Sequence, residues 1–327
     1  SLGYGRIEKL FAGGRVETPV GTLEIPANVP ASAAGPDVRE WVLGSEGRLG
    51  IITAATVRVS PLPEREEFHA LFFPTFEAGL SAVRAIMQAK LPLAMLRLST
   101  ATETTTTLVL AGHTLLIGGL ERYLALRGAG DEKCMLILGV AGREVVARTA
   151  FKAARDIAGD HGGVYVGQTF GKTWHKNRFK SPYLRDSLWE AGYAIDTLET
   201  ATDWARVPAL IEAIEGALHA ALLERDEFVH VFTHLSHTYP YGSNVYTQYL
   251  FRRARTPEET LERWQALKTA ASQAIVAQGA TISHQHGVGV DHKPYLTAEK
   301  GEVGMKGLRA LVTTLDPDGI MNPGKLL

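Results

Sequence analysis

A short glycine-rich segment near the start of the chain constrains its fold more than any other feature. Gly44, Gly47 and Gly50 recur at regular spacing, and the β-branched run at positions 51–53 follows directly. Glycine tolerates positive φ and leaves the backbone open to a ligand, and the N–H groups of such loops can bind a polar cofactor. The spacing predicts a loop that runs into a strand, either a plain tight turn or a cofactor-binding loop. A second Pro- and Gly-rich segment, at positions 316–325, favours the cofactor-binding loop.

The composition excludes several classes of protein. Lys+Arg 34 and Asp+Glu 35 nearly cancel, so we expect no nucleic-acid partner. The single cysteine, Cys134, excludes an internal disulfide framework and a multi-cysteine zinc site, and its apolar neighbours predict a buried thiol. We see no apolar run of transmembrane length and no signal peptide, so we expect a cytoplasmic enzyme.

The alternation of strand and helix patterns predicts an α+β fold in three stretches. Residues 1–62 have the pattern of short strands and turns, and a Pro-Leu-Pro run marks their end. Residues 63–286 repeat strand–helix–strand units, which predicts an antiparallel sheet with helices on one face. Residues 287–327 return with a helix and the Pro- and Gly-rich tail.

The individual elements are predicted from hydrophobic spacing. We expect strands at 68–73, 93–98, 106–110, 135–140, 193–200, 228–235 and 244–251, and helices at 76–90, 143–158, 207–223 and 297–314. One further helix has a clear start, because Thr256 can cap it, Pro257 takes the first helical position and Glu259 can complete a capping box.

Histidines are concentrated in the last third of the chain. In an extended segment His284 and His286 would point the same way, with Gln285 opposite. Three interpretations stay open: ordinary histidines with satisfied hydrogen bonds, a metal site, or a proton-transfer pair beside a redox cofactor.

Three further side chains could take part in chemistry. Tyr246 lies on the strand expected to pair with the strand at 228–235, and is either a packing residue or a candidate acid/base. Arg97 stands in an apolar strand, where a charge must meet a carboxylate or an anionic ligand. Arg185, beside an aspartate, has the surroundings of an ordinary paired arginine.

The order of these motifs resembles a known family. GSEGRLGIIT, MLRLS, PYLRDSLWEAG, HTYPYGSNVYTQYLF, SHQHGVG and DPDGIMNPGKLL follow one another along the chain. Together they resemble the alkyldihydroxyacetonephosphate synthases and their bacterial relatives, within the vanillyl-alcohol oxidase superfamily of FAD-linked oxidases. The resemblance implies part of a PCMH-type FAD-binding domain at 1–62 and 287–327, a ferredoxin-like cap domain at 63–286, and FAD as cofactor. It also implies that a segment gripping the FAD pyrophosphate precedes Ser1.

The resemblance further implies roles for single residues. The positions that match its FAD-contacting loop are Glu46, Gly47, Arg48, Leu49, Gly50, Ile51 and Ile52. Arg185 matches the arginine that binds the substrate phosphate, Arg97 one needed for activity, and Tyr246 the catalytic acid/base. His284 and His286 match the outer members of a histidine triplet whose middle member is Gln285 here. Glutamine cannot shuttle a proton at neutral pH, so this departure bears on the ether-lipid reaction itself.

Three functions follow as alternatives. In the family's reaction a fatty alcohol replaces the fatty acid of acyl-dihydroxyacetone phosphate at the flavin, so the first is such an enzyme, acting on a small or lipid-like anionic substrate. The second is a FAD-linked oxidoreductase of a 2-hydroxy acid, in which Arg97 holds the carboxylate and His284 and His286 deprotonate the hydroxyl. The third is a flavin-free cap-domain fragment with a structural or binding role. Peripheral membrane association and a homodimer are left open.

Overall fold

The computed structural model describes residues 2–27, 31–112, 114–180 and 183–327. The chain divides into two compact units. One consists of residues 3–61 together with 282–327, and the other of residues 62–281. The histidine-bearing segment at 283–286, which we expected in the middle stretch, belongs to the unit built from both ends of the chain.

The unit built from both ends contains a small antiparallel sheet in the order β2-β1-β3. Its strands are β1 (Phe11–Thr18), β2 (Gly21–Ile25) and β3 (Ile51–Val57), and its helices are α1 (Ile7–Leu10), α2 (Arg39–Val42) and α11 (Leu296–Leu315), with a 3-10 turn at Lys293–Tyr295. Gly14 is required where β1 meets β3, because a Cβ there would stand 2.2 Å from the carbonyl oxygen of Ala54. Strand β3 follows the glycine-rich loop, as predicted, and every one of its residues is exposed.

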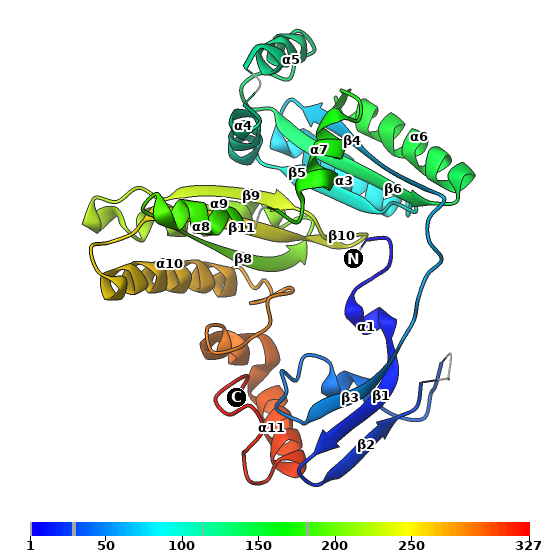
Figure 1. Ribbon diagram of the computed structural model, residues 1–327, viewed down its shortest axis with the longest axis vertical. Helices are drawn as coiled ribbons and strands as arrows, with labels where there is room; N and C mark the ends of the chain where they lie inside the picture. Colours follow the sequence, from blue (N-terminus) through cyan, green and yellow to red (C-terminus); the bar gives the residue numbers. More distant parts are fainter. Residues whose placement is uncertain (1, 28–30, 113, 181–182) are drawn as a thin grey trace. The chain divides into compact units, whose positions relative to one another are not determined.

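The unit of residues 62–281 contains an eight-stranded sheet whose pairings are all antiparallel, in the order β10-β11-β9-β5-β6-β4-β7 with β8 beside β11 (Figure 1). The strands are β4 (Arg65–Phe73), β5 (Met95–Ser99), β6 (Cys134–Gly142), β7 (Val164–Tyr165), β8 (Tyr193–Asp203), β9 (His230–Leu235), β10 (Thr238–Tyr239) and β11 (Gly242–Arg252). The helices are α3 (Phe76–Gln88), α4 (Ala101–Leu110), α5 (Thr114–Leu126), α6 (Glu144–Asp160), α7 (Thr169–Asn177), α8 (Leu184–Glu190), α9 (Val207–Ala220) and α10 (Pro257–Ala277), with a 3-10 turn at Leu223–Arg225. The predicted antiparallel sheet is confirmed.

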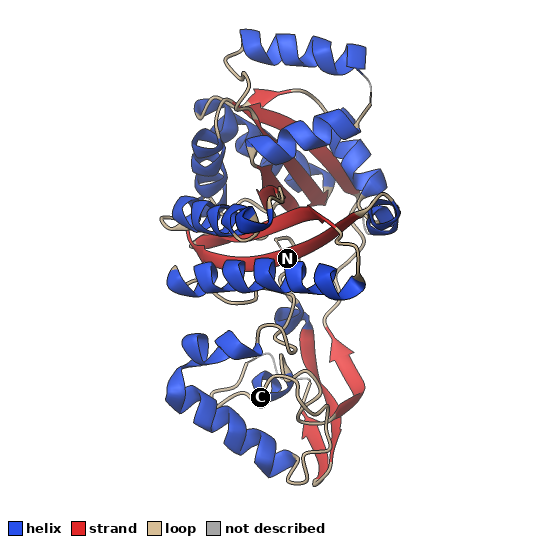
Figure 2. Ribbon diagram, turned by 90° about the vertical axis from the view of Figure 1, so that its left-hand side faces the viewer, coloured by secondary structure: helices blue, strands red, loops and turns tan. Residues whose placement is uncertain are grey.

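Helices lie on both sides of the large sheet (Figure 2). Around β4 and β6 both faces are covered, whereas the sequence pattern indicated helices on one face. On one face Phe72 packs in a cluster with Leu108 of α4 and Leu124 of α5. On the other, the ring of His69 stacks on Phe151 of α6 at 3.7 Å between centroids. The physical reason is that six consecutive residues at the end of β4 are buried, so both faces of the strand need an apolar cover.

The segment we expected as a strand at 106–110 is the second half of helix α4, so that prediction was wrong. Its threonines favour a strand by intrinsic preference, but the difference is a few tenths of a kcal/mol per residue. Thr104 and Leu108, four residues apart, are both buried against the sheet. Packing therefore overrode propensity.

Around β8, β9 and β11 the sheet is covered differently. In β11, Val245, Thr247 and Tyr249 are buried, whereas Tyr246 and Gln248 are half-buried. The buried face packs on α9 and α10, as shown by Trp264 of α10, whose indole nitrogen donates to Asp196 of β8 at 2.7 Å. The other face carries polar side chains, of which Tyr246 and Gln248 are half-buried.

Several local predictions are confirmed. Helix α10 begins after Thr256, whose hydroxyl accepts from the backbone N–H of Glu259. Cys134 is fully buried, and burial raises the pKa of its thiol to about 12.

Among the described residues, no helix combines the length and the hydrophobicity needed to span a lipid bilayer.

Candidate functional site

Four neighbouring strands of the large sheet each place one polar side chain on the same face. Ser99 of β5 stands opposite His234 of β9, His234 opposite Tyr246 of β11, and Tyr246 opposite Glu199 of β8. Directly opposed residues in an antiparallel sheet lie on one face. Arg97, two residues before Ser99 on β5, shares that face because side chains alternate along a strand. The register therefore assembles a row of polar groups from segments far apart in the sequence.

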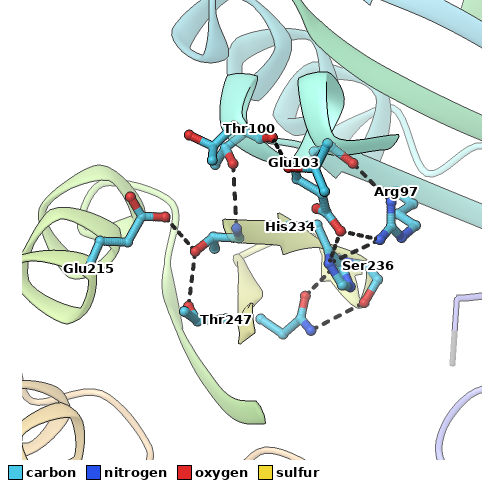
Figure 3. Close-up of polar contacts among 12 residues, drawn as sticks. Arg97, Thr100, Glu103, Glu215, His234, Ser236 and Thr247 are labelled. Carbon is cyan, nitrogen blue, oxygen red and sulfur yellow. Dashed lines mark hydrogen bonds and ion pairs between the residues drawn. The ribbon is translucent and has the colours of Figure 1, made fainter. Parts of the chain in front are cut away.

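Arg97 is paired, as the sequence predicted. Its Nη2 lies 2.6 Å from Oε1 of Glu103, in the first turn of α4, and its Nη1 donates to the hydroxyl of Ser99 at 2.9 Å. The same Nη2 lies 3.2 Å from Nδ1 of His234 (Figure 3). The guanidinium charge is therefore neutralised inside the protein by a buried carboxylate.

Glu103 and His234 form the buried part of this group. Oε1 of Glu103 lies 3.2 Å from Nδ1 of His234, so that nitrogen either donates to Glu103 or accepts from Arg97, depending on the tautomer. Burial would raise the pKa of Glu103, but Arg97 and His234 lower it to about 2. Burial and the charge of Arg97 lower the pKa of His234, and Glu103 opposes them. The site at neutral pH holds an ionised carboxylate and a neutral imidazole.

Tyr246 lies against this group. Its ring stacks on His234, with centroids 4.8 Å apart and planes 23° from parallel. Burial and the charge of Glu199 raise the pKa of Tyr246, and a hydrogen bond with Thr197 opposes them. The phenol is half-buried and protonated at neutral pH, which is the form that a general acid needs.

A second buried carboxylate closes the row. Glu199 is 4% exposed and accepts from the amide of Asn244 at 2.7 Å, and it lies 3.8 Å from Nε2 of His237. The carbonyl oxygen of the Asn244 side chain accepts from the backbone N–H groups of Ser236 and His237. Asn244 thereby fixes the loop after β9 and holds the Glu199 carboxylate.

Arg185 does not join this group. It is exposed on α8 and lines a pocket of about 360 Å³ with Trp189, Asp196 and Trp264, among others. The pocket takes residues from both faces of β8, because Ile195 shares the face of Tyr246, whereas Asp196 shares the face that α10 covers. The expected role of Arg185 in binding a substrate phosphate stays a prediction.

In the unit built from both ends of the chain, the two predicted glycine-rich segments meet, as expected. The carboxylate of Glu46 accepts from the backbone N–H groups of Val288 and Gly289, the latter at 2.8 Å. The amide of Asn322 donates to the carbonyl oxygen of Glu46, and the guanidinium of Arg48 to that of Met321. These contacts join residues that are 242 to 276 positions apart.

The loop at 46–52 has the backbone that its glycines predict. Glu46 and Gly47 have φ of 53° and 77°, in the left-handed region. Gly50 is required because a Cβ there would stand 2.5 Å from the carbonyl oxygen of Glu17. Leu49 is buried, whereas Ile51 and Ile52 are 61% and 51% exposed.

The histidine segment departs from its prediction. Residues 284–286 form a bend rather than an extended strand. His284 is buried, whereas Gln285 and His286 are exposed, and the extended segment on which a shared direction of the two imidazoles depended is not formed. Gly287 follows the bend with φ of 76°, and a Cβ there would stand 2.8 Å from the carboxylate of Glu46. Within the described ranges, no three His, Cys, Asp or Glu side chains are grouped to hold a metal ion.

The loop at 44–52 fits a flavin cofactor. No atom lies within 4 Å of the position that a Cβ on Gly44 would take, so the backbone there is open. Ile51 and Ile52 offer apolar surface. The Nε of Arg48 is buried without a hydrogen-bond partner among the described residues, so it is a spare donor.

Three residues of the polar face were missed by sequence reasoning: Glu103, His234 and Glu199. A signal for Glu103 existed, since Arg97 required a carboxylate and Glu103 is the nearest acid along the chain. It was overlooked because the threonine-rich stretch around it suggested a strand. No sequence signal marked Glu199, whose place depends on the pairing of β8 with β11.

Comparison with known proteins finds similar sequences and structures. The chain is 30% identical over 331 residues to an alkyldihydroxyacetonephosphate synthase of Dictyostelium discoideum, and 27% identical to one of Trypanosoma brucei brucei, with 99% of this chain covered in both cases. A solved structure of alkyldihydroxyacetonephosphate synthase superposes with a TM-score of 0.75 at 25% identity, over 98% of this chain and 54% of that one. The chain spans about half the length of the curated relatives, covering 54% and 53% of them.

The family assignment rests on most of the sequence. Residues 62–326 match the family described as FAD linked oxidases, C-terminal domain. The match includes the whole large sheet with its polar face and the segment that contacts Glu46. This chain belongs to the family of FAD linked oxidases.

Proposed function

We propose that the protein containing this chain is a FAD-dependent enzyme similar to the alkyldihydroxyacetonephosphate synthases, and that it acts on an anionic substrate. The observation that carries the proposal is the group formed by Arg97, His234 and Tyr246 on the polar face of the sheet and Glu103 of α4 beside them. It combines a fixed cation, which can orient an anion, with a half-buried phenol, which can donate and recover a proton.

Each residue has a defined task in this proposal. Arg97 orients the substrate anion through the N–H groups that Glu103 and Ser99 leave available. Tyr246 holds the proton that the reacting carbon loses and regains. FAD, bound in part by the loop at 46–52, supplies the electron sink when present. His284 and His286 are proposed to accept and return protons during the reaction. Gln285, which lies between them, is proposed only as a hydrogen-bonding group.

Replacing Tyr246 tests the proposal. In the full-length, FAD-loaded protein, Tyr246→Phe lowers turnover at least about tenfold, because one proton-transfer contribution is lost. The measurement is steady-state kinetics of alkyl-for-acyl exchange. Tyr241→Phe is the control, since Tyr241 is 76% exposed, and it leaves turnover unchanged. Wild-type turnover in Tyr246→Phe, or a purified full-length protein without flavin, contradicts the proposal.

One observation favours a second function, the oxidation of a 2-hydroxy acid. The charge of Arg97 is already neutralised by Glu103, which leaves little net charge there for a phosphate dianion. A single carboxylate needs only one guanidinium. A flavin absorbance at about 450 nm that bleaches when a 2-hydroxy acid is added under anaerobic conditions would support this function. Alkyl-for-acyl exchange without bleaching would select the first.

A further inference from the structure

Glu103 is a buried carboxylate with an unusual set of contacts. Its side chain is 4% exposed, and one oxygen, Oε1, faces both Nη2 of Arg97 at 2.6 Å and Nδ1 of His234 at 3.2 Å. The other oxygen, Oε2, is buried and has no hydrogen-bond partner among the described residues. A buried carboxylate oxygen without a hydrogen bond lowers the stability of the folded protein. Because Glu103 makes its contacts only through Oε1, it is poorly suited as a purely structural residue, and a role beyond packing is indicated.

The backbone around Glu103 is anchored from two strands. At the start of α4, the N–H of Thr100 donates to the carbonyl oxygen of Thr233 on β9 at 2.9 Å, and the hydroxyl of Thr100 accepts from the N–H of Thr233. The hydroxyl of Thr104 accepts from the N–H of Met135 on β6 at 2.9 Å. The first turn of α4 is therefore fixed to the sheet on both sides of Glu103, which limits where its carboxylate can lie (Figure 3).

The contacts of Glu103 lead directly to the tyrosine of the proposed function. Glu103 holds the imidazole of His234, and that imidazole stacks on the ring of Tyr246 at 4.8 Å. It also holds Arg97, the proposed anchor for the substrate anion. One carboxylate thus sets the positions of both the acid/base and the anion-binding group.

We propose that Glu103 is the positioning residue of this site: its carboxylate fixes His234 beneath the phenol of Tyr246 and aligns Arg97 beside it. This inference rests on the proposed function, since it assigns Glu103 a task in that reaction. Glu103 acts through His234 and Arg97 and contacts neither substrate nor cofactor. Misplacement of a reacting group by about 1 Å can cost up to about a hundredfold in rate, which gives the positioning its importance.

Replacing Glu103 should shift the titration of the Tyr246 phenol in a direction that the surrounding charges determine. The charged and titratable groups that act on Tyr246 are Arg97, His234 and Glu199 on its own face, and Asp196 on the opposite face. Arg97 lowers the pKa of Tyr246, and Glu103 neutralises Arg97. Glu103→Gln therefore leaves the guanidinium uncompensated and moves the titration of the Tyr246 phenol to lower pH. Glu103→Asp keeps the charge and shortens the reach.

The first experiment measures the phenol itself. Tyrosine labelled at Cζ with carbon-13 is titrated by NMR in the full-length protein, and Tyr246→Phe identifies its signal among the ten tyrosines. We expect an acid shift of the Tyr246 titration in Glu103→Gln and none in Glu215→Gln. Glu215 is the matched control, because it is a carboxylate bound at 2.6 Å to Thr233, the neighbour of His234, on the opposite face. An unchanged titration in Glu103→Gln would overturn the inference.

The second experiment is a double-mutant cycle on turnover. Glu103→Gln alone lowers kcat about tenfold or more, but adds little in the Tyr246→Phe background, because a positioning residue has nothing left to position. A full additional loss in that background overturns the inference while the proposed function stands. Unchanged turnover in Tyr246→Phe alone contradicts the proposed function instead. If Glu103→Gln does not fold, Glu103→Asp takes its place in the cycle, with the same two outcomes.

Discussion

The large sheet of residues 62–281 has two halves that are covered differently. Around β4 and β6, helices pack on both faces, and most strand residues are buried. Around β8, β9 and β11, helices α9 and α10 pack on one face, and the other face keeps Glu199, His234 and Tyr246. Strand β5 lies between the halves and carries Arg97 at the border.

The difference shows how one sheet can serve both stability and chemistry. A strand covered on both faces is mostly apolar, which leaves few positions for reactive side chains. A strand covered by helices on one face alternates, so every second residue can be polar. The proposed site therefore begins where the double cover ends, beside the first turn of α4.

The largest effect tests the covered half. Phe72 is fully buried, and its ring meets Phe170 edge-on at 5.8 Å. Phe72→Ala lowers the free energy of unfolding by about 3–5 kcal/mol, through lost burial and the cavity left behind. Gln248→Ala, on the open face, changes it by less than about 0.5 kcal/mol. Urea unfolding measures both, and equal losses would remove the distinction between the halves.

The next effect tests the buried charge at the border. The pKa of Glu103 is held at about 2, below its ordinary value of 4.5. A depressed carboxyl pKa stabilises the folded state above about pH 4.5, and this stabilisation is lost as the pH falls toward 2. It amounts to roughly 3 kcal/mol. Unfolding of wild type and Glu103→Gln at pH 7 and pH 2.5 checks this. If the free energies of unfolding of wild type and Glu103→Gln differ by the same amount at pH 7 and at pH 2.5, the Glu103 carboxylate is not held ionised.

A smaller effect compares one buried histidine from each half. Burial lowers the pKa of His69 and of His234 below the usual value of 6.5. Below pH 6.5 the unfolded chain then binds protons that the folded protein does not, so stability falls as the pH decreases toward the folded pKa. The slope is at most about 1.4 kcal/mol per pH unit for each imidazole. His69→Gln and His234→Gln should each flatten the decline between pH 7 and 5, and an unaltered slope would contradict the assignment.

The smallest effect compares the helix caps of the two halves. Thr75 caps α3, which packs against β4 and β5, and Thr256 caps α10 beside β8, each by accepting from a backbone N–H three residues on. Thr75→Ala and Thr256→Ala each cost about 1 kcal/mol. Equal losses of stability in the two variants, measured by thermal unfolding, would show that the two halves differ in how their sheet faces are covered and not in how their helices are capped. A loss confined to one variant would argue that one of the two helices does not depend on its cap.

Much of the architecture could be predicted from the sequence, because the signals are local. The helix cap at Thr256, the buried Cys134 and the loop of Gly44 to Gly50 all depend on neighbours within a few residues. The need of Arg97 for a counter-charge was also predictable, because a charge in an apolar strand must be paired. The same local reasoning failed for α4, whose threonines suggested a strand that packing did not allow.

The sequence by itself determined the family, the antiparallel sheet and the meeting of its two glycine-rich segments. Only the tertiary structure decided that Glu103 would be the partner of Arg97 and His234, and that residues 284–286 would form a bend. The physical reason is distance along the chain. Glu103 and His234 are 131 residues apart, and strand register, which shifts every side chain to the other face when it slips by one residue, brings them together.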